Sequence, residues 1–136
     1  MNLGLKDRVA LVTGASRGLG RATCLAFGAE GAHLAVHYFD QPDDALALCD
    51  LLTTQFGVRA VPIHADITRE ADCEALFETA LAAFGRADIL VNNAGLWPTA
   101  FVKEMSRQQW DHTLAANLTG PFMLSQRMVR YLLAAG

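Results

Sequence analysis

Four short apolar runs recur along the chain at intervals of 25 to 29 residues. They are rich in Val, Ile, Leu and Ala, and they cover residues 8–13, 33–38, 59–65 and 88–93. Between the runs, apolar side chains recur every three or four positions, for example at Ala22, Leu25, Ala26 and Ala29. Short apolar strands that alternate with helical segments are typical of βαβ units, whose strands form a parallel sheet.

The predicted strands carry apolar residues at consecutive positions, so both of their faces are apolar. This composition is expected where helices cover both faces of a parallel sheet. Crossovers between parallel strands are almost always right-handed, which leaves few topologies. We therefore predict an α/β protein with a doubly wound parallel sheet and helices on both faces.

Glycine, proline and capping residues predict where the helices begin and end. The glycines expected to stop the first three helices are Gly31, Gly57 and Gly85. The residues expected to cap helix starts are Asp43, Thr68 and Ser106. A last helix is expected over residues 107–134, with a kink or local break at Gly120-Pro121 because proline removes a helical hydrogen bond.

Composition and charge narrow the classes of protein to consider. A chain of 136 residues makes one domain at most, residues 1–136, and its 52% of hydrophobic residues can fill a core. The net charge of −3 provides no basic surface for a phosphate backbone, so nucleic acid is not expected as a partner.

Membrane insertion and secretion are not expected either. The longest stretch without Asp, Glu, Lys or Arg is residues 112–126, whereas a membrane span needs about 20 mostly apolar residues. Charges at Lys6, Asp7 and Arg8 precede only a short apolar run, unlike a secretory signal. We therefore expect a cytoplasmic location.

The cysteines and histidines do not form a ligand set for a metal. Cys24, Cys49 and Cys73 are far apart, and no C-x-x-C or H-x-x-x-H pattern occurs. We expect each cysteine to be a small buried residue of a successive helix, and we expect no metal site.

The segment TGASRGLG, residues 13–20, follows the first predicted strand and opens the first helix. Its glycines are Gly14, Gly18 and Gly20. Residues without Cβ allow a sharp turn and let a diphosphate approach backbone N–H groups at a helix start. The alternative is a plain turn in which glycine only lets the helix pack closely on the strand.

The spacing G-x-x-x-G-x-G at this position resembles that of the short-chain dehydrogenase/reductase family. Three further segments match in order: Asp66-Ile67 after the third strand, Asn92-Asn93-Ala94-Gly95 after the fourth, and Asn117 in the last helix. The resemblance spans nearly the whole chain. It implies a Rossmann-like domain that binds NAD(P) and an oxidoreductase that interconverts a carbonyl and an alcohol.

The resemblance also assigns roles to individual residues. It implies cofactor contacts from Gly14, Ser16, Arg17, Gly18, Leu19, Gly20, Tyr38, Asp66, Ile67, Asn93, Ala94 and Gly95. It further implies that Asp66 binds the adenine and that Asn117 holds a water in the catalytic proton relay. Alternatives remain for four of them: a helix cap for Asp66, a tie between strand ends for Asn93, a bond to a nearby carbonyl for Asn117, and a solvated surface charge for Arg17.

The choice of cofactor depends on the end of the second strand. Asp40 lies about 20 residues past the glycines, where an acid that binds the ribose 2′-hydroxyl favours NAD. The family's discriminating acid aligns instead with Tyr38, and Arg17 resembles the basic residue that NADP-preferring members use for the 2′-phosphate. We therefore expect NADP(H) to be preferred over NAD(H).

The family's catalytic tyrosine and lysine have no counterpart in this chain. Four residues after Tyr38 is Pro42, and four after Tyr131 is Ala135, so no Y-x-x-x-K occurs. We expect a truncated, incomplete domain with strand order 3-2-1-4, the fourth strand at an edge, and no turnover by the chain alone. Residues 107–134 are apolar on more than one face, which fits the homo-oligomers that the resemblance implies; the alternative is that this helix simply covers the sheet.

Other functions remain open. The chain could be a non-catalytic dinucleotide-binding module, or a truncated gene product that acts, if at all, through oligomerisation. A methyltransferase has a similar sheet, but it is expected to have a different glycine spacing and an acid at the end of the second strand. The identity of the carbonyl or alcohol substrate does not follow from the sequence.

Overall fold

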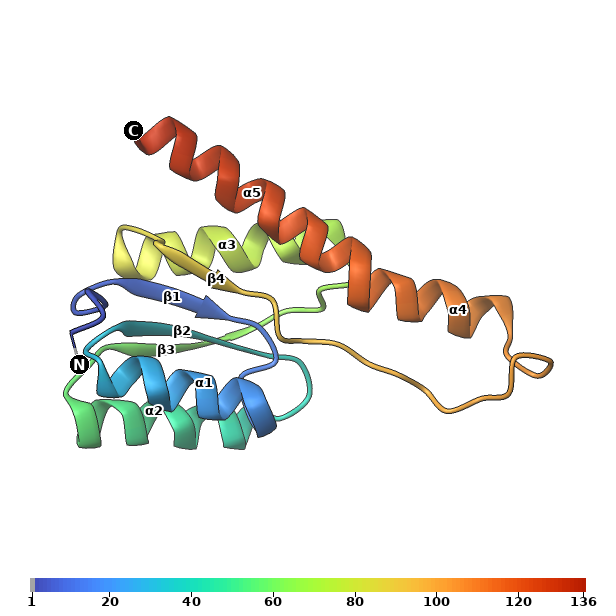
Figure 1. The fold of residues 1–136 in the computed structure, drawn as a ribbon, viewed down its shortest axis with the longest axis horizontal. Helices are drawn as coiled ribbons and strands as arrows, with labels where there is room; N and C mark the ends of the chain where they lie inside the picture. The colour runs from blue at the N-terminus through green and yellow to red at the C-terminus, as the bar shows by residue number, and fades with distance from the viewer. Residues whose placement is uncertain (1) are drawn as a thin grey trace.

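The computed structural model describes residues 2–136 as a four-stranded parallel sheet between two layers of helices (Figure 1). The strands are β1 (Val9–Val12), β2 (His33–Tyr38), β3 (Ala60–His64) and β4 (Ile89–Val91). Their order is β3-β2-β1-β4, which confirms the predicted order and the edge position of β4. Val12 pairs with Val36 and with Val91, so the carboxyl ends of the three strands lie at one edge of the sheet.

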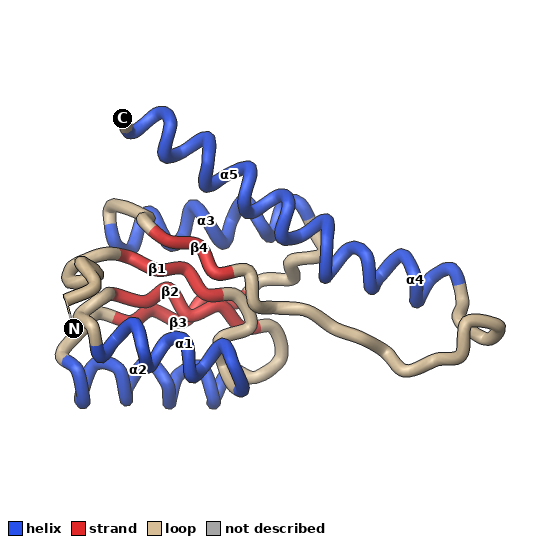
Figure 2. The backbone as a smooth tube through the Cα atoms, viewed as in Figure 1, coloured by secondary structure: helices blue, strands red, loops and turns tan. Residues whose placement is uncertain are grey.

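Alternate residues of β1 face opposite layers, as the strand period requires. Ala10 and Val12 face α1 (Gly18–Ala29) and α2 (Pro42–Phe56), and Leu11 faces α3 (Glu70–Phe84) and α5 (Gly120–Ala135). Figure 2 shows the two helical layers on opposite faces of the sheet. The prediction of helices on both faces is therefore confirmed.

The glycine stops are confirmed, but two of the predicted caps are wrong. Gly57 and Gly85 have left-handed backbone conformations and end α2 and α3. α2 begins at Pro42 rather than after Asp43, because proline suits the first helical turn. α3 begins at Glu70 rather than after Thr68, whose N–H and hydroxyl are bound to Asp66. The prediction for Ser106 is confirmed, since Ser106 and Gln109 form a capping box at the start of α4 (Arg107–Leu114).

The last helical segment is interrupted where the sequence predicts a break. It consists of α4 (Arg107–Leu114), a π-helical turn η1 (Ala115–Thr119) and α5. Pro121 has no N–H to return to the carbonyl four residues earlier, which favours the wider turn. A Cβ on Gly120 would lie 2.5 Å from the Ile67 carbonyl oxygen, so glycine also allows this turn to contact the segment after β3.

The three cysteines lie one in each of α1, α2 and α3, and all are buried and unpaired among residues 2–136, as predicted. Burial raises the pKa of the Cys24 thiol to about 12 and, with the neighbouring charges of Asp50 and Asp72, those of Cys49 and Cys73 to about 11. They contribute as small apolar side chains of the core.

One face of α5 is apolar and exposed, as its composition predicts. Leu124 and Met128 are buried against the sheet, whereas Phe122, Val129 and Leu133 are more than half exposed. Within residues 2–136, none of the helices combines the length and apolarity needed to cross a bilayer.

Candidate functional site

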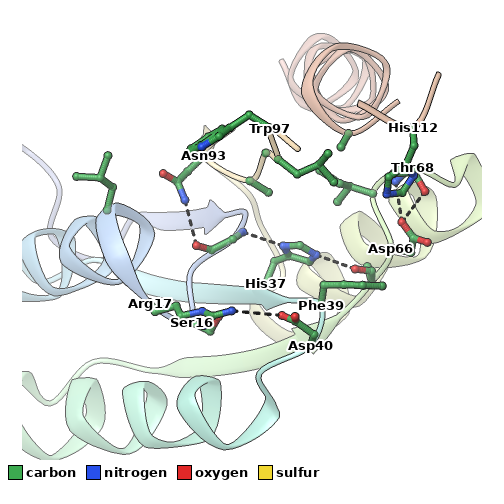
Figure 3. A pocket seen from close by; sticks show the side chains of 18 residues that line it. Ser16, Arg17, His37, Phe39, Asp40, Asp66, Thr68, Asn93, Trp97 and His112 are labelled. Atoms are coloured by element: carbon green, nitrogen blue, oxygen red, sulfur yellow. Dashed lines mark hydrogen bonds and ion pairs between the residues drawn. The ribbon is translucent and has the colours of Figure 1, made fainter. Parts of the chain in front are cut away.

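A cleft of about 610 Å³ lies at the carboxyl ends of the strands, a size typical of sites for small organic ligands. Open α/β sheets bind ligands at this edge. Figure 3 shows the side chains that line the cleft. The structure brings together nine predicted residues there: Gly14, Ser16, Arg17, Leu19, Asp66, Ile67, Asn93, Ala94 and Gly95. Gly18, Gly20, Tyr38 and Asn117 do not line it.

The loop between β1 and α1, residues 13–18, makes a turn that only glycine fits without strain. Gly14 and Gly18 have φ angles of +60° and +59°, which disfavour residues with a Cβ. A Cβ on Gly14 would lie 2.9 Å from Cα of Ala94. A Cβ on Gly20 would lie 2.2 Å from the Gly14 carbonyl oxygen. Close packing, the structural alternative, is therefore one real function of these glycines.

The loop also leaves donors free. α1 begins at Gly18 without a side-chain cap and without an acidic residue in its first turn. The N–H groups of Arg17, Gly18 and Leu19 donate to no acceptor in the described residues 2–136. The first turn of a helix carries a partial positive charge, so these donors form a site suited to an anion such as a diphosphate.

Asn93 ties the loop to the end of β4. Its Nδ2 donates to the carbonyl oxygens of Thr13 and Gly14, at 3.0 Å each. The Thr13 hydroxyl accepts from the N–H groups of Asn93 and Ala94, also at 3.0 Å. The structure thus has the tie between strand ends that the sequence left as an alternative, and it places Ala94 and Gly95 against the cleft.

Asp66 closes the opposite side of the cleft. Its Oδ1 accepts from the N–H of Thr68 at 3.0 Å and from the Thr68 hydroxyl at 2.6 Å, so it forms an Asx turn and does not cap α3. Partial burial alone would raise the pKa of Asp66, but the bonds from Thr68 and the charges of Arg69 and His112 leave it lowered. Its Oδ2 accepts from no group within residues 2–136, so a charged carboxylate oxygen is available to a ligand.

The end of β2 presents Phe39 and Asp40 to the cleft, rather than Tyr38. Tyr38 packs beside the core cluster and against the ring of His64, at 5.5 Å between ring centroids. The Arg17 guanidinium lies 3.9 Å from the Asp40 carboxylate, and both side chains are 64% exposed. A basic and an acidic group therefore stand together at this corner of the cleft (Figure 3).

Asn117 lies in the π-helical turn η1, and both of its polar atoms bind the backbone of Leu96. Its Oδ1 accepts from the Leu96 N–H at 2.7 Å, and its Nδ2 donates to the Leu96 carbonyl at 2.5 Å. This is the carbonyl bond that the sequence left open. It fastens the loop after β4, residues 92–106, to the last helical segment.

Nine of the residues that line the cleft were not predicted as cofactor contacts, and four of these carry rings: His37, Phe39, Trp97 and His112. A signal existed for His37, since it is a polar residue within the apolar run 33–38. Phe39 and His112 reach the cleft through the path of the loop after β2 and the placement of α4, which periodicity does not reveal. Within residues 2–136, no group of three His, Cys, Asp or Glu side chains is placed to hold a metal.

Comparison with known families matches residues 8–136 to the short chain dehydrogenase family. The chain therefore belongs to the short-chain dehydrogenase/reductase family. Its sheet order and its glycine loop agree with this class of protein.

Among curated proteins, the chain is 34% identical over 130 residues to glucose 1-dehydrogenase 2 of Bacillus subtilis (strain 168), with 95% of this chain and 50% of that protein covered. L-Sorbose reductase from Gluconobacter frateurii, solved with NADPH and L-sorbose, is 31% identical with a TM-score of 0.93; 100% of this chain and 51% of that chain are covered. A short chain dehydrogenase from Burkholderia cenocepacia J2315, solved with NADP, is 33% identical with a TM-score of 0.90, and 93% of this chain and 51% of that chain are covered. The chain thus spans about half the length of these relatives.

Proposed function

We propose that this chain binds a nicotinamide dinucleotide, and that it is the cofactor-binding part of an oxidoreductase that interconverts a small carbonyl compound and an alcohol. The observation that carries the proposal is the set of free N–H groups at the start of α1, where Arg17 and Leu19 line the same cleft as Asp66. The relatives solved with NADPH and NADP support it.

In this proposal the loop donors of Arg17, Gly18 and Leu19 hold the diphosphate, and Oδ2 of Asp66 accepts from the adenine amino group. Ala94 and Gly95 line the ribose side, held there by the bonds of Asn93. When bound, the nicotinamide supplies or accepts the hydride. The names of the relatives, glucose dehydrogenase and sorbose reductase, favour a sugar or polyol as the substrate class.

Calorimetric titration of NADPH and NADH into the chain tests the proposal. We expect saturable 1:1 binding of at least one dinucleotide, and competition from ADP-ribose, which shares the diphosphate and adenosine groups. Absence of heat and of any change in nicotinamide fluorescence at millimolar concentrations of both dinucleotides would remove the proposal.

Arg17 is proposed to select the 2′-phosphate and hence NADP(H). Arg17→Ala is expected to weaken NADPH binding about tenfold, since a charge-assisted bond to phosphate is lost, and to change NADH binding less than about twofold. Arg21→Ala is the matched control, because Arg21 is exposed in the first turn of α1, four residues after Arg17, but outside the cleft. Titration of both dinucleotides measures the effect. Should Asp40 instead select the 2′-hydroxyl, Arg17→Ala would leave NADPH affinity unchanged and Asp40→Asn would weaken NADH binding.

The chain alone is expected to show no turnover, because neither Tyr38 nor Tyr131 is followed four residues later by lysine. NADPH absorbance with a panel of ketoses, aldoses and ketones measures this. A rate that is proportional to protein concentration and is lost in Asn117→Ala would contradict it. Binding without turnover supports the alternative of a dinucleotide-binding module, whose exposed apolar face on α5 is proposed to associate with a second copy.

A further inference from the structure

His37 is a buried polar side chain near the carboxyl end of β2, one of the two central strands of the sheet. It is 2% exposed and precedes the last residue of β2. Its Nδ1 lies 2.9 Å from the backbone nitrogen of Gly14, and its Nε2 lies 2.9 Å from the carbonyl oxygen of Ala65. Figure 3 shows the ring between the glycine loop on one side and the segment after β3 on the other.

The two partners determine the protonation state of the ring. The Gly14 N–H can only donate, so Nδ1 must be unprotonated and accept. The Ala65 carbonyl can only accept, so Nε2 must carry the hydrogen. The geometry is thus satisfied by the neutral Nε2–H tautomer, whereas a doubly protonated ring would place two donors against each other at Gly14.

These contacts set the direction in which the loop presents its donors. The N–H of Gly14 binds the His37 ring, and the N–H of Ala15 binds the His37 carbonyl at 2.9 Å. Both donors therefore point into the sheet, and the next ones, from Arg17 onward, remain for a ligand. On the other side, Ala65 directly precedes Asp66, so the same ring sets the separation between the loop and the Asp66 turn.

We propose that His37 is a positioning residue for the dinucleotide: as a neutral imidazole it holds the glycine loop and the Asp66 turn at the spacing that binding requires, and its protonation releases Gly14 and weakens binding. The proposal rests on the proposed function for the nature of the ligand. The link between His37 and the loop can be tested without any ligand.

The charged and titratable groups around His37 come from each element that borders it. They are Arg17 in the loop, Asp40 after β2, His64 and Asp66 at the end of β3, and His112 on α4 across the cleft. Burial lowers the pKa of His37, and the charge of His64 adds to this; the bond to Ala65 and the charge of Asp66 oppose it without reversing it. The ring is therefore neutral at neutral pH and protonates below the value of about 6.5 usual for an exposed histidine.

Long-range ¹H–¹⁵N NMR of the histidine rings and the Gly14 amide resonance test the link directly. At pH 7.5 we expect His37 in the Nε2–H form and a Gly14 amide that exchanges slowly with solvent. On acidification, the His37 resonances and the Gly14 amide should shift with the same midpoint. An Nδ1–H tautomer, or a His37 titration that leaves the Gly14 amide unmoved, would overturn the proposal.

The pH dependence of dinucleotide binding tests the consequence. One proton coupled to binding changes affinity by up to about tenfold per pH unit, so the wild-type Kd for NADPH should rise as the pH falls through the His37 midpoint that the NMR titration gives, by up to about tenfold per pH unit below it. In His37→Asn the amide oxygen can accept from Gly14 but does not titrate, so binding at pH 8 is retained and this acid loss disappears. His37→Leu should weaken binding about tenfold at every pH, since Gly14 loses its acceptor.

His33→Asn is the matched control. His33 begins the same strand, and its Nδ1 accepts from the Arg59 N–H at 3.0 Å, but it lies at the far end of the strand from the cleft. This variant should keep the wild-type pH profile. The 2′-phosphate of NADPH titrates with every variant. Differences between the pH profiles of the variants therefore report the contribution of His37 alone.

The outcomes separate the two proposals. An acid loss of the same size in His37→Asn as in the wild type would overturn the role of His37, even though binding exists. Absence of binding in every variant would overturn the proposed function, while the NMR titration still decides whether His37 holds the loop. Should His37→Leu fail to fold, as circular dichroism would show, His37→Asn and the NMR data decide the case.

Discussion

Replacing Gly20 with alanine is expected to abolish dinucleotide binding and to lower the free energy of unfolding by about 2–4 kcal/mol. The added Cβ would lie 2.2 Å from the Gly14 carbonyl oxygen and 2.6 Å from Nδ2 of Asn93. It would therefore break the hydrogen bond from Asn93 to the Gly14 carbonyl, which ties the loop to the end of β4. The N–H groups of the loop that are proposed to bind the diphosphate would be displaced as a result. Urea unfolding followed by circular dichroism measures the stability, and calorimetric titration with NADPH measures the binding.

Gly18→Ala is the matched control for this prediction. Gly18 lies in the same loop with a φ of +59°, but a Cβ there would meet nothing within 4 Å. Only the strain of the left-handed conformation remains, about 1 kcal/mol. The comparison is of stability, because the N–H of Gly18 is itself proposed to bind the diphosphate. A loss of stability in Gly20→Ala no larger than in Gly18→Ala would show that the contact between Gly20 and the loop does not contribute as described.

Replacing Phe77 with alanine is expected to cost about 3–5 kcal/mol of unfolding free energy. Phe77 is fully buried on α3, where it makes an edge contact with Tyr131 at 5.8 Å between centroids. The Arg127 guanidinium lies 4.7 Å above the same ring and also binds Glu74 and Glu78. The substitution thus leaves a cavity and weakens the contact between α3 and α5, and urea unfolding measures the sum.

Phe122→Ala is the corresponding control on α5. Its ring is 59% exposed, so its loss should change stability by less than about 0.5 kcal/mol. A cost for Phe77→Ala as small as that for Phe122→Ala would mean that the layer formed by α3 and α5 does not pack against the sheet as described.

Much of the fold was predictable because strand positions and crossovers follow from local sequence. The apolar run 33–38 became β2 with the predicted bounds, and Gly57 and Gly85 ended their helices. The wrong caps have a local cause that residue type alone does not show. Thr68 is a good cap in isolation, but its hydroxyl donates to the carboxylate of Asp66, two residues earlier.

The site was predictable where one motif carries the whole geometry, as in the loop from Gly14 to Gly20. It was not predictable where residues far apart in sequence meet. His37 reaches Gly14 across 23 residues and Ala65 across 28. Phe39 and Asp40 line the cleft in place of Tyr38 because β2 ends at Tyr38, directly before Phe39, and the direction of side chains at a strand end depends on that boundary.

The reactivity of the three buried cysteines can report partial unfolding of the chain. Their raised pKa values leave almost no reactive thiolate at neutral pH, and their neighbours exclude alkylating reagents. Each helix layer must open before its sulfur reacts, with Cys24 and Cys49 reporting on one face of the sheet and Cys73 on the other. Alkylation rates, read cysteine by cysteine by mass spectrometry, would therefore tell which face opens first and how strongly a bound dinucleotide slows each one.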